Sequence, residues 1–273
     1  TTGDEARVFG TVSEFIPGGA GTGNLSITQL TSPEVVILSS DNALPEAVVI
    51  GQSGRVAPSE IVISDDELPT NLQETAGVFD PEQDAIDFYE AVEGMRVTVE
   101  DAIAVSPTRV FNSFSAEAFT LPNQGATATP DDVLTARGGI NLQSGPDNTG
   151  DQNPERVQIQ FDPNLLPDGF DTPALTVGDK LGDVTGVVGY SFGNFEVNVT
   201  ESFDVTPSDL EQEVTSLTGG DDQLTVASYN VLTLSALEEA DAQRELLAEQ
   251  VVSNLGSPDV IGLQEIQDNT GTE

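Results

Sequence analysis

Two stretches near the carboxyl end of the chain decide the fold there: Val226-Ala227-Ser228-Tyr229-Asn230-Val231 and Asp259-Val260-Ile261-Gly262-Leu263-Gln264-Glu265. Each is a short run of aliphatic, β-branched and aromatic residues, which predicts a strand. Between them Leu247, Val251 and Leu255 recur every four residues and predict a helix with one apolar face. Together they indicate a β-α-β unit, which cannot bury both sides of its strands unaided.

The predicted helix has signals at both ends. Ser235 is followed three positions later by Glu238, the capping-box arrangement, so we expect the helix to begin at Ser235. Gly256 and Pro258 predict its end. We expect exposed strand edges and local instability in this unit.

One polar residue follows each of the two strands. Asn230 and Glu265 are 35 positions apart, but parallel strands of a β-α-β unit bring both residues to the same edge of the sheet. A carboxylate at this edge can hold a hard cation such as Mg²⁺, and a neutral amide can orient a phosphate oxygen. The alternative is that Asn230 and Glu265 are ordinary loop residues.

The preceding two thirds of the chain predict an all-β domain. Short segments rich in β-branched and aromatic residues are separated by Gly, Pro, Asn and Asp, which favours a barrel or a sandwich. One helix is predicted at 81–93, and 122–153 is expected to form a long loop. We place the β domain at 6–205, a linker at 206–222 and the β-α-β unit at 223–273. The predicted strands are 7–15, 25–30, 35–38, 47–50, 96–105, 157–161, 184–190 and 195–200.

Composition excludes several kinds of chemistry. The chain has neither His nor Cys, so imidazole bases, thiolate metal sites and disulfides are all ruled out. Its 47 acidic and 8 basic residues give a net charge of −39, which repels a polyanion unless salt or a bound metal intervenes. This charge fits a halophilic setting or an acidic secreted protein. No run approaches the roughly 18 apolar residues of a membrane span. The first residues lack Met and a signal segment, so we expect processing or truncation there.

Two further motifs resemble binding sites. Asp80, Glu82, Asp84 and Asp87 resemble a calcium loop, but Ala85 and Ala91 stand where an EF-hand needs Gly and Glu. These acids also suit the start of a helix. The glycine-rich stretch 18–24 lies between strands without a phosphate-binding Lys, which favours a hairpin loop over a nucleotide site.

The stretches 228–231 and 258–265 resemble the start of the endonuclease/exonuclease/phosphatase superfamily, whose fold is DNase I-like. The stretches 7–15, 25–30, 87–90 and 94–97 resemble the OB-like domain that precedes this catalytic domain in large secreted bacterial nucleases. The resemblance implies an OB-like barrel followed by the first β-α-β unit of an incomplete α/β sandwich. It also implies that Asn230 helps position the scissile phosphate and that Glu265 is a metal ligand.

The resemblance further implies a secreted nuclease. Its cofactor would be Mg²⁺ or Mn²⁺, with Ca²⁺ as a further candidate, and its substrate would be DNA rather than RNA. The family's later catalytic residues, a His among them, have no counterpart in the chain, so we expect these 273 residues to be inactive alone. The β domain would act as a spacer or present substrate. The alternative is a non-enzymatic, acidic, β-rich binding module, and neither hypothesis predicts a membrane or protein partner.

Overall fold

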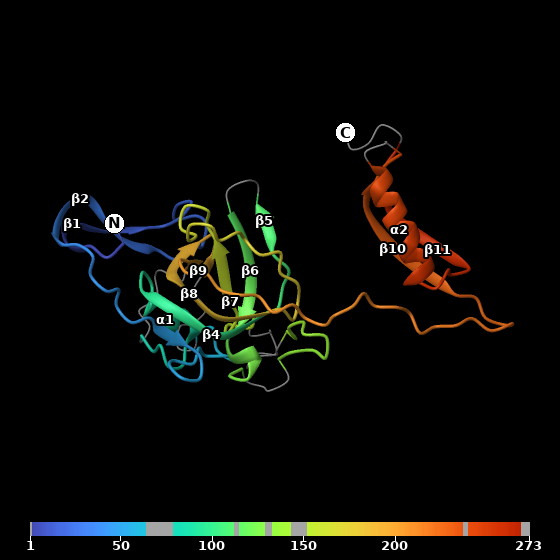
Figure 1. The fold of residues 1–273 in the computed structure, drawn as a ribbon, viewed down its shortest axis with the longest axis horizontal. Coiled ribbons are helices and arrows are strands. Elements are labelled where there is room, and N and C mark those ends of the chain that lie inside the picture. The colour runs from blue at the N-terminus through green and yellow to red at the C-terminus, as the bar shows by residue number, and fades with distance from the viewer. Residues whose placement is uncertain are drawn as a thin grey trace. The chain divides into compact units, whose positions relative to one another are not determined.

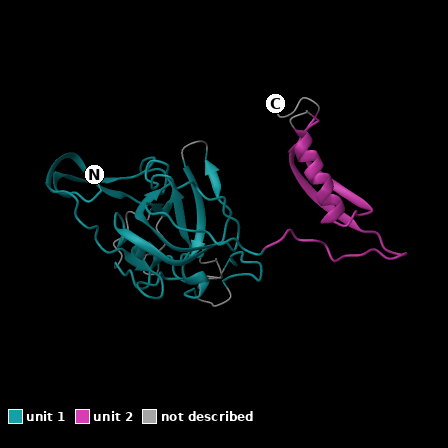
Figure 2. Ribbon diagram, viewed as in Figure 1, with its two compact units in different colours: residues 1–209 teal, residues 210–273 magenta. Residues whose placement is uncertain are grey.

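The computed structural model describes residues 2–63, 79–111, 115–128, 133–142, 152–236 and 240–268. It is mainly β, as the sequence predicts, and divides into two compact units, residues 1–209 and 210–273 (Figure 2). The division falls inside the segment predicted to be a linker, where 207–220 form neither helix nor strand.

The larger unit contains a seven-stranded sheet (Figure 1). In hydrogen-bonded order the sheet comprises β3 (Val48–Ile50), β4 (Arg96–Ala104), β8 (Lys180–Ser191), β9 (Asn194–Val199), β7 (Val157–Phe161), β6 (Ser115–Leu121) and β5 (Arg109–Phe111). A further pairing of Ile103 with Leu121 and of Ala104 with Thr120 joins strand β4 to strand β6. Strands β4, β8, β9, β7 and β6 therefore close into a ring, in which the β7–β9 pair is parallel and the other pairs are antiparallel.

The core of this unit follows from the alternation of side chains along its strands. Val97 and Val99 of β4 are fully buried, as are Ile159 and Phe161 of β7, while the polar residues between them are more exposed. Phe88 of the short helix α1 (Ala85–Glu90) joins the same cluster. Burial of each such side chain stabilises the fold by about 1.5 to 3 kcal/mol before conformational entropy is counted.

The predicted helix at 81–93 is shorter in the structure, where α1 spans Ala85–Glu90. The backbone N–H groups of Ala85 and Ile86 donate to the carbonyls of Ile61 and Val62, so the turn at 81–83 does not continue into the helix as one hydrogen-bonded ladder. At the other end Gly94, with φ +70°, donates its N–H to Val188 of β8. Contacts with distant segments therefore set both ends of this helix.

Strands β5 and β6 were not predicted from the sequence. The inward positions of β6 are Ala116, Ala118 and Thr120, all nearly or fully buried. Small residues at these positions hide the alternation that marks a strand, because Ala has low β-propensity. Part of the loop predicted at 122–153 forms the turn η2 (Pro122–Gly125) and an isolated bridge between Leu134 and Ile140.

The hairpin predicted between 184–190 and 195–200 is confirmed. Strands β8 and β9 pair antiparallel around Phe192 and Gly193, which have φ of +48° and +85°. Two consecutive positive φ values match the twist of the flanking strands.

A long two-stranded hairpin precedes the ring. It consists of β1 (Glu5–Phe15) and β2 (Ile27–Ser39). The segments 25–30 and 35–38, predicted as separate strands, are joined in β2, which begins at Ile27. A register shift lies opposite Phe9 and Thr11, and Ser32 there has φ +50°, so β2 continues through an irregularity. Exposed apolar side chains on this hairpin include Val8, Val12, Leu30, Val35 and Ile37.

The smaller unit is the predicted β-α-β unit. Strands β10 (Val226–Leu234) and β11 (Val260–Ile266) pair in parallel, and α2 (Asp241–Ser253) connects them. The predicted apolar face of the helix, with Leu247, Val251 and Leu255, is half-buried. The Tyr229 hydroxyl donates to Oε1 of Gln250, which ties strand to helix.

The predicted helix start at Ser235 is wrong. Helix α2 begins at Asp241, and Glu238 lies outside the described residues. Side chains of the first helical turn instead contact the segment before the helix. Gln243 Nε2 donates to the carbonyls of Val231 and Leu232 in β10, and Arg244 donates to the carbonyl of Ser235.

Candidate functional site

The structure brings Asn230 and Glu265 together. Asn230 is paired with Gln264 in the parallel ladder, so Glu265 is displaced by one residue along β11. The Asn230 Nδ2 group donates a hydrogen bond of 2.7 Å to Oε1 of Glu265. Residues 35 positions apart in the sequence therefore form one polar group on the small parallel sheet.

The backbone around this pair departs from regular strand geometry. Leu232, Thr233 and Glu265 all have positive φ, at +49°, +56° and +61°, and the ladder between β10 and β11 is irregular after Asn230. The Leu232 N–H donates to Oδ1 of Asn230 at 2.9 Å. The amide is thus held at both its oxygen and its nitrogen, and three non-glycine residues adopt an unfavourable conformation around it.

The pair offers few ligands for a metal. Glu265 and Asn230 are both exposed, and no cluster of three or more Asp and Glu side chains placed to hold a metal is found in the described part of the chain. Mg²⁺ commonly keeps several waters and takes one or two carboxylates plus substrate phosphate oxygens, so Glu265 fits as a single protein ligand. A Ca²⁺ site needs six to eight oxygens, and this pair does not supply them.

The acidic residues near α1 do not form a calcium loop in the described residues. Asp80 donates its N–H to Asp87 Oδ2 at 2.6 Å, and its own Oδ2 accepts a hydrogen bond from Gln83. Asp87 lies in the first turn of α1, where a negative charge interacts favourably with the helix dipole. These contacts match the alternative interpretation, an acidic helix start.

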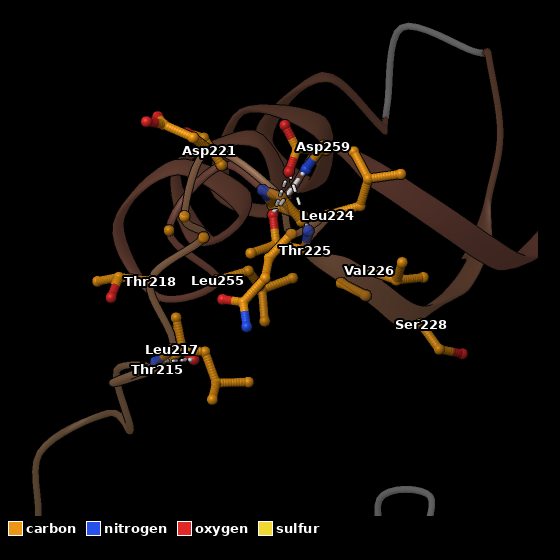
Figure 3. A pocket seen from close by; sticks show the side chains of 17 residues that line it. Thr215, Leu217, Thr218, Asp221, Leu224, Thr225, Val226, Ser228, Leu255 and Asp259 are labelled. Atoms are coloured by element: carbon orange, nitrogen blue, oxygen red, sulfur yellow. Dashed lines mark hydrogen bonds between the residues drawn. The ribbon is translucent and has the colours of Figure 1, made fainter.

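A large hollow of about 1280 Å³ lies at the opposite end of the small sheet (Figure 3). It is lined by residues near the amino ends of β10 and β11, and so it does not include Asn230 or Glu265. Asp259 Oδ2 accepts 2.9 Å hydrogen bonds from both the N–H and the hydroxyl of Thr225. These two donors lower the pKa of Asp259. The Thr225–Asp259 contact therefore links the segments that lead into β10 and β11.

A smaller cavity of about 320 Å³ lies in the larger unit. Its lining includes Tyr89, Phe119, Arg156 and Gln158, none of which was singled out from the sequence. Their positions span 70 residues of sequence without a shared motif, so only the folded chain reveals them.

The fold thus defines a mainly β protein that carries a small β-α-β unit. Residues 49–209 match the family model described as Domain of unknown function (DUF8508), and the chain belongs to this family. No curated protein and no solved structure matches the chain. Among the described residues no helix is long and apolar enough to cross a membrane.

Proposed function

We propose that residues 223–273 form the first β-α-β unit of a secreted, metal-dependent phosphodiesterase of the endonuclease/exonuclease/phosphatase superfamily, acting on nucleic acid, with DNA favoured over RNA. The observation that carries this proposal is the 2.7 Å contact between Asn230 and Glu265 where the regular pairing of two parallel strands stops. Such an edge is where α/β sheets place their ligands.

In this proposal Glu265 holds Mg²⁺ or Mn²⁺ directly. The bound ion would polarise a phosphate oxygen and neutralise charge that develops on it. Asn230 uses one N–H of its amide group on Glu265, and an amide group has a second N–H to offer a phosphate oxygen. Asn230 would then orient both the carboxylate and the substrate.

The larger unit supports the second part of the proposal, an OB-like domain at 6–205. The OB-fold is a five-stranded Greek-key barrel, and the ring of β4, β8, β9, β7 and β6 has five strands with non-sequential neighbours. Its role in this proposal is to space or present substrate, because the eight cations of the chain are scattered in sequence and give no linear basic patch.

The second candidate function is a non-enzymatic, acidic binding module. It is favoured by the small number of ligands at the site: the described residues supply one carboxylate and one amide, and the chain has no His. One carboxylate does not by itself activate a water or clamp both oxygens of a displacement.

Metal binding distinguishes the two candidates. Titration of the ¹⁵N-labelled chain with Mn²⁺ is expected to broaden the Asn230 side-chain amide resonances first, because Glu265 Oε1 is 2.7 Å from Nδ2. Glu265→Gln should abolish this selective broadening, and Glu249→Gln on α2 should not. Equal broadening beside acidic residues throughout the chain would support the binding module.

The chain of 273 residues is expected to be inert as a nuclease. Incubation with plasmid DNA and Mg²⁺ or Mn²⁺ should yield no more nicking than Glu265→Ala, because the chain has no His and the described site supplies one carboxylate and one amide. Cleavage by the unmutated chain above that control would contradict the expected inactivity.

A further inference from the structure

The cavity of about 320 Å³ in the larger unit has an unusual lining for this chain. Asp and Glu account for 47 of the 273 residues, yet none of the 17 described residues that line the cavity is acidic. The single charged residue in this lining is Arg156. A negatively charged ligand is therefore not repelled by the residues that line the cavity. The molecule as a whole, with its net charge of −39, repels such a ligand.

Arg156 is placed as an anion receptor. Its guanidinium lies 4.2 Å from the centre of the Phe119 ring and makes no hydrogen bond or ion pair with any residue that the structure describes. Burial lowers the pKa of Arg156, although nearby Glu155 and Glu117 raise it. A half-buried guanidinium with unused donors matches a carboxylate, which it can bind through two parallel hydrogen bonds.

Aromatic rings form the apolar part of the cavity. Tyr89 and Phe195 stack with ring centres 5.6 Å apart, and Tyr190 meets the edge of Phe195 at 5.0 Å. The backbone N–H of Leu25 donates to the Tyr190 hydroxyl at 3.1 Å, which leaves the hydroxyl hydrogen to donate elsewhere. This contact also brings the β1–β2 loop to the edge of the cavity, beside the ring strands.

The polar part of the lining consists of amides. Each amide side chain both donates and accepts hydrogen bonds, as sugar hydroxyls do, so the set is complementary to a hydroxyl-rich ring. In Gln158 the Oε1 atom is buried without a hydrogen-bond partner, whereas Nε2 donates to Glu117 and Glu196. Because this atom is closed to solvent, a ligand hydroxyl reaches it once the Gln158 side chain turns toward the cavity. The amide residues of the lining are Asn24, Gln152, Asn153, Gln158 and Asn194.

We propose that this cavity binds a sugar ring that carries one carboxylate, as in a uronic acid. Arg156 binds the carboxylate, the amide side chains hydrogen-bond the hydroxyls, and the aromatic rings pack on the apolar face of the sugar. The volume suits one ring, since ligand pockets start at about 300 Å³. One guanidinium with two glutamates nearby favours a single charge over the double charge of a phosphate monoester. This site goes beyond the proposed function, since its residues belong to the larger unit, whereas Asn230 and Glu265 belong to the smaller one.

The full chain tests the proposal in solution. Tyrosine fluorescence can report binding, because the chain has no Trp and two of its three Tyr residues line the cavity. At constant ionic strength, galacturonate or glucuronate should bind saturably and about tenfold more tightly than galactose or glucose, the value of one charge-assisted contact. The Arg156 Nε–H resonance should shift with the uronates.

Variants locate the site. Arg156→Gln should remove the preference for the charged sugar. Arg109→Gln should keep it, because Arg109 also packs on a Phe ring, Phe111, but does not line the cavity. The measurement on the unmutated chain stands even if Arg156→Gln folds poorly. Equal affinity for charged and neutral sugars, tighter binding of thymidine monophosphate or benzoate, or no saturation at tens of millimolar would each overturn the proposal.

Discussion

At the scale of single residues, Glu90 shows how this acidic chain manages its charge. Glu90 ends α1 and is half-buried, with Glu93, Asp87 and Glu14 of β1 close enough to interact with it. Burial, and to a smaller extent these three carboxylates, raise its pKa to about 7. Burial is the main cause that raises the pKa of Tyr190, and the negative charge of Glu90 raises it as well.

Glu90 should therefore make stability depend on pH. Its folded pKa of about 7 exceeds the ordinary value of 4.5, so the folded state holds the proton more tightly and stability falls as pH rises from about 4.5 to 7. Glu90→Gln should raise the free energy of unfolding at pH 7.5 by about 1 to 2 kcal/mol after allowance for solvent screening. At pH 4 it should have little effect.

Urea denaturation at the two pH values measures this difference. Glu82→Gln, an exposed carboxylate just before α1, is the matched control and should leave the pH dependence unchanged. A Glu90→Gln variant with the same pH dependence as the unmutated chain would contradict the raised pKa.

At the scale of elements, the turn of the β8–β9 hairpin carries a local mismatch. Phe192 occupies the first turn position with φ +48°, and its side chain is 95% exposed. Such a position favours Asn, and a bulky residue there is strained. The hairpin forms because the pairing of β8 with β9, and the ease with which Gly193 adopts positive φ, stabilise it by more than the strain at Phe192 costs.

Replacing Phe192 should stabilise the hairpin. Phe192→Asn creates the Asn-Gly sequence preferred in such turns and should increase the free energy of unfolding by about 0.5 to 1 kcal/mol. Phe192→Ala removes the exposed ring without favouring positive φ and is the control. Thermal unfolding followed by circular dichroism measures both, and equal effects of Asn and Ala would count against the conformational explanation.

At the scale of the whole molecule, the net charge of −39 opposes the compact state of the chain. Salt screens this repulsion, and the screening length falls from about 30 Å at 0.01 M to about 8 Å at 0.15 M. Raising NaCl over this range should therefore increase the unfolding midpoint. Sodium thiocyanate should raise the unfolding midpoint as NaCl does at these low concentrations, because ion-specific effects on stability need higher salt concentrations. An unchanged midpoint would show that repulsion between surface charges is unimportant.

The smaller unit should be the less stable of the two. Helix α2 has no fully buried side chain, and Val226, Val260 and Ile266 are more than half exposed. This unit therefore buries little apolar surface that could stabilise it. Amide hydrogens of β10 and β11 should therefore exchange with solvent much faster than those of β4 and β8. Equal protection measured by hydrogen exchange would contradict this prediction.

The sequence by itself determined the elements whose signals are local. The branched residues of β10 and β11 mark strands, the interval between them demands a parallel crossover, and so Asn230 and Glu265 could be placed together from sequence. The same is true of the β8–β9 hairpin, whose turn contains Gly193.

The tertiary structure alone decided the features that depend on distant contacts. Strand β6 pairs with β7 and buries Ala118, and the first turn of α2 contacts β10 and Ser235 through Gln243 and Arg244. The cavity around Arg156 is assembled from segments scattered between Gly23 and Phe195. Local periodicity carries no information about such neighbours, since packing and hydrogen bonds between distant segments select them only as the chain closes.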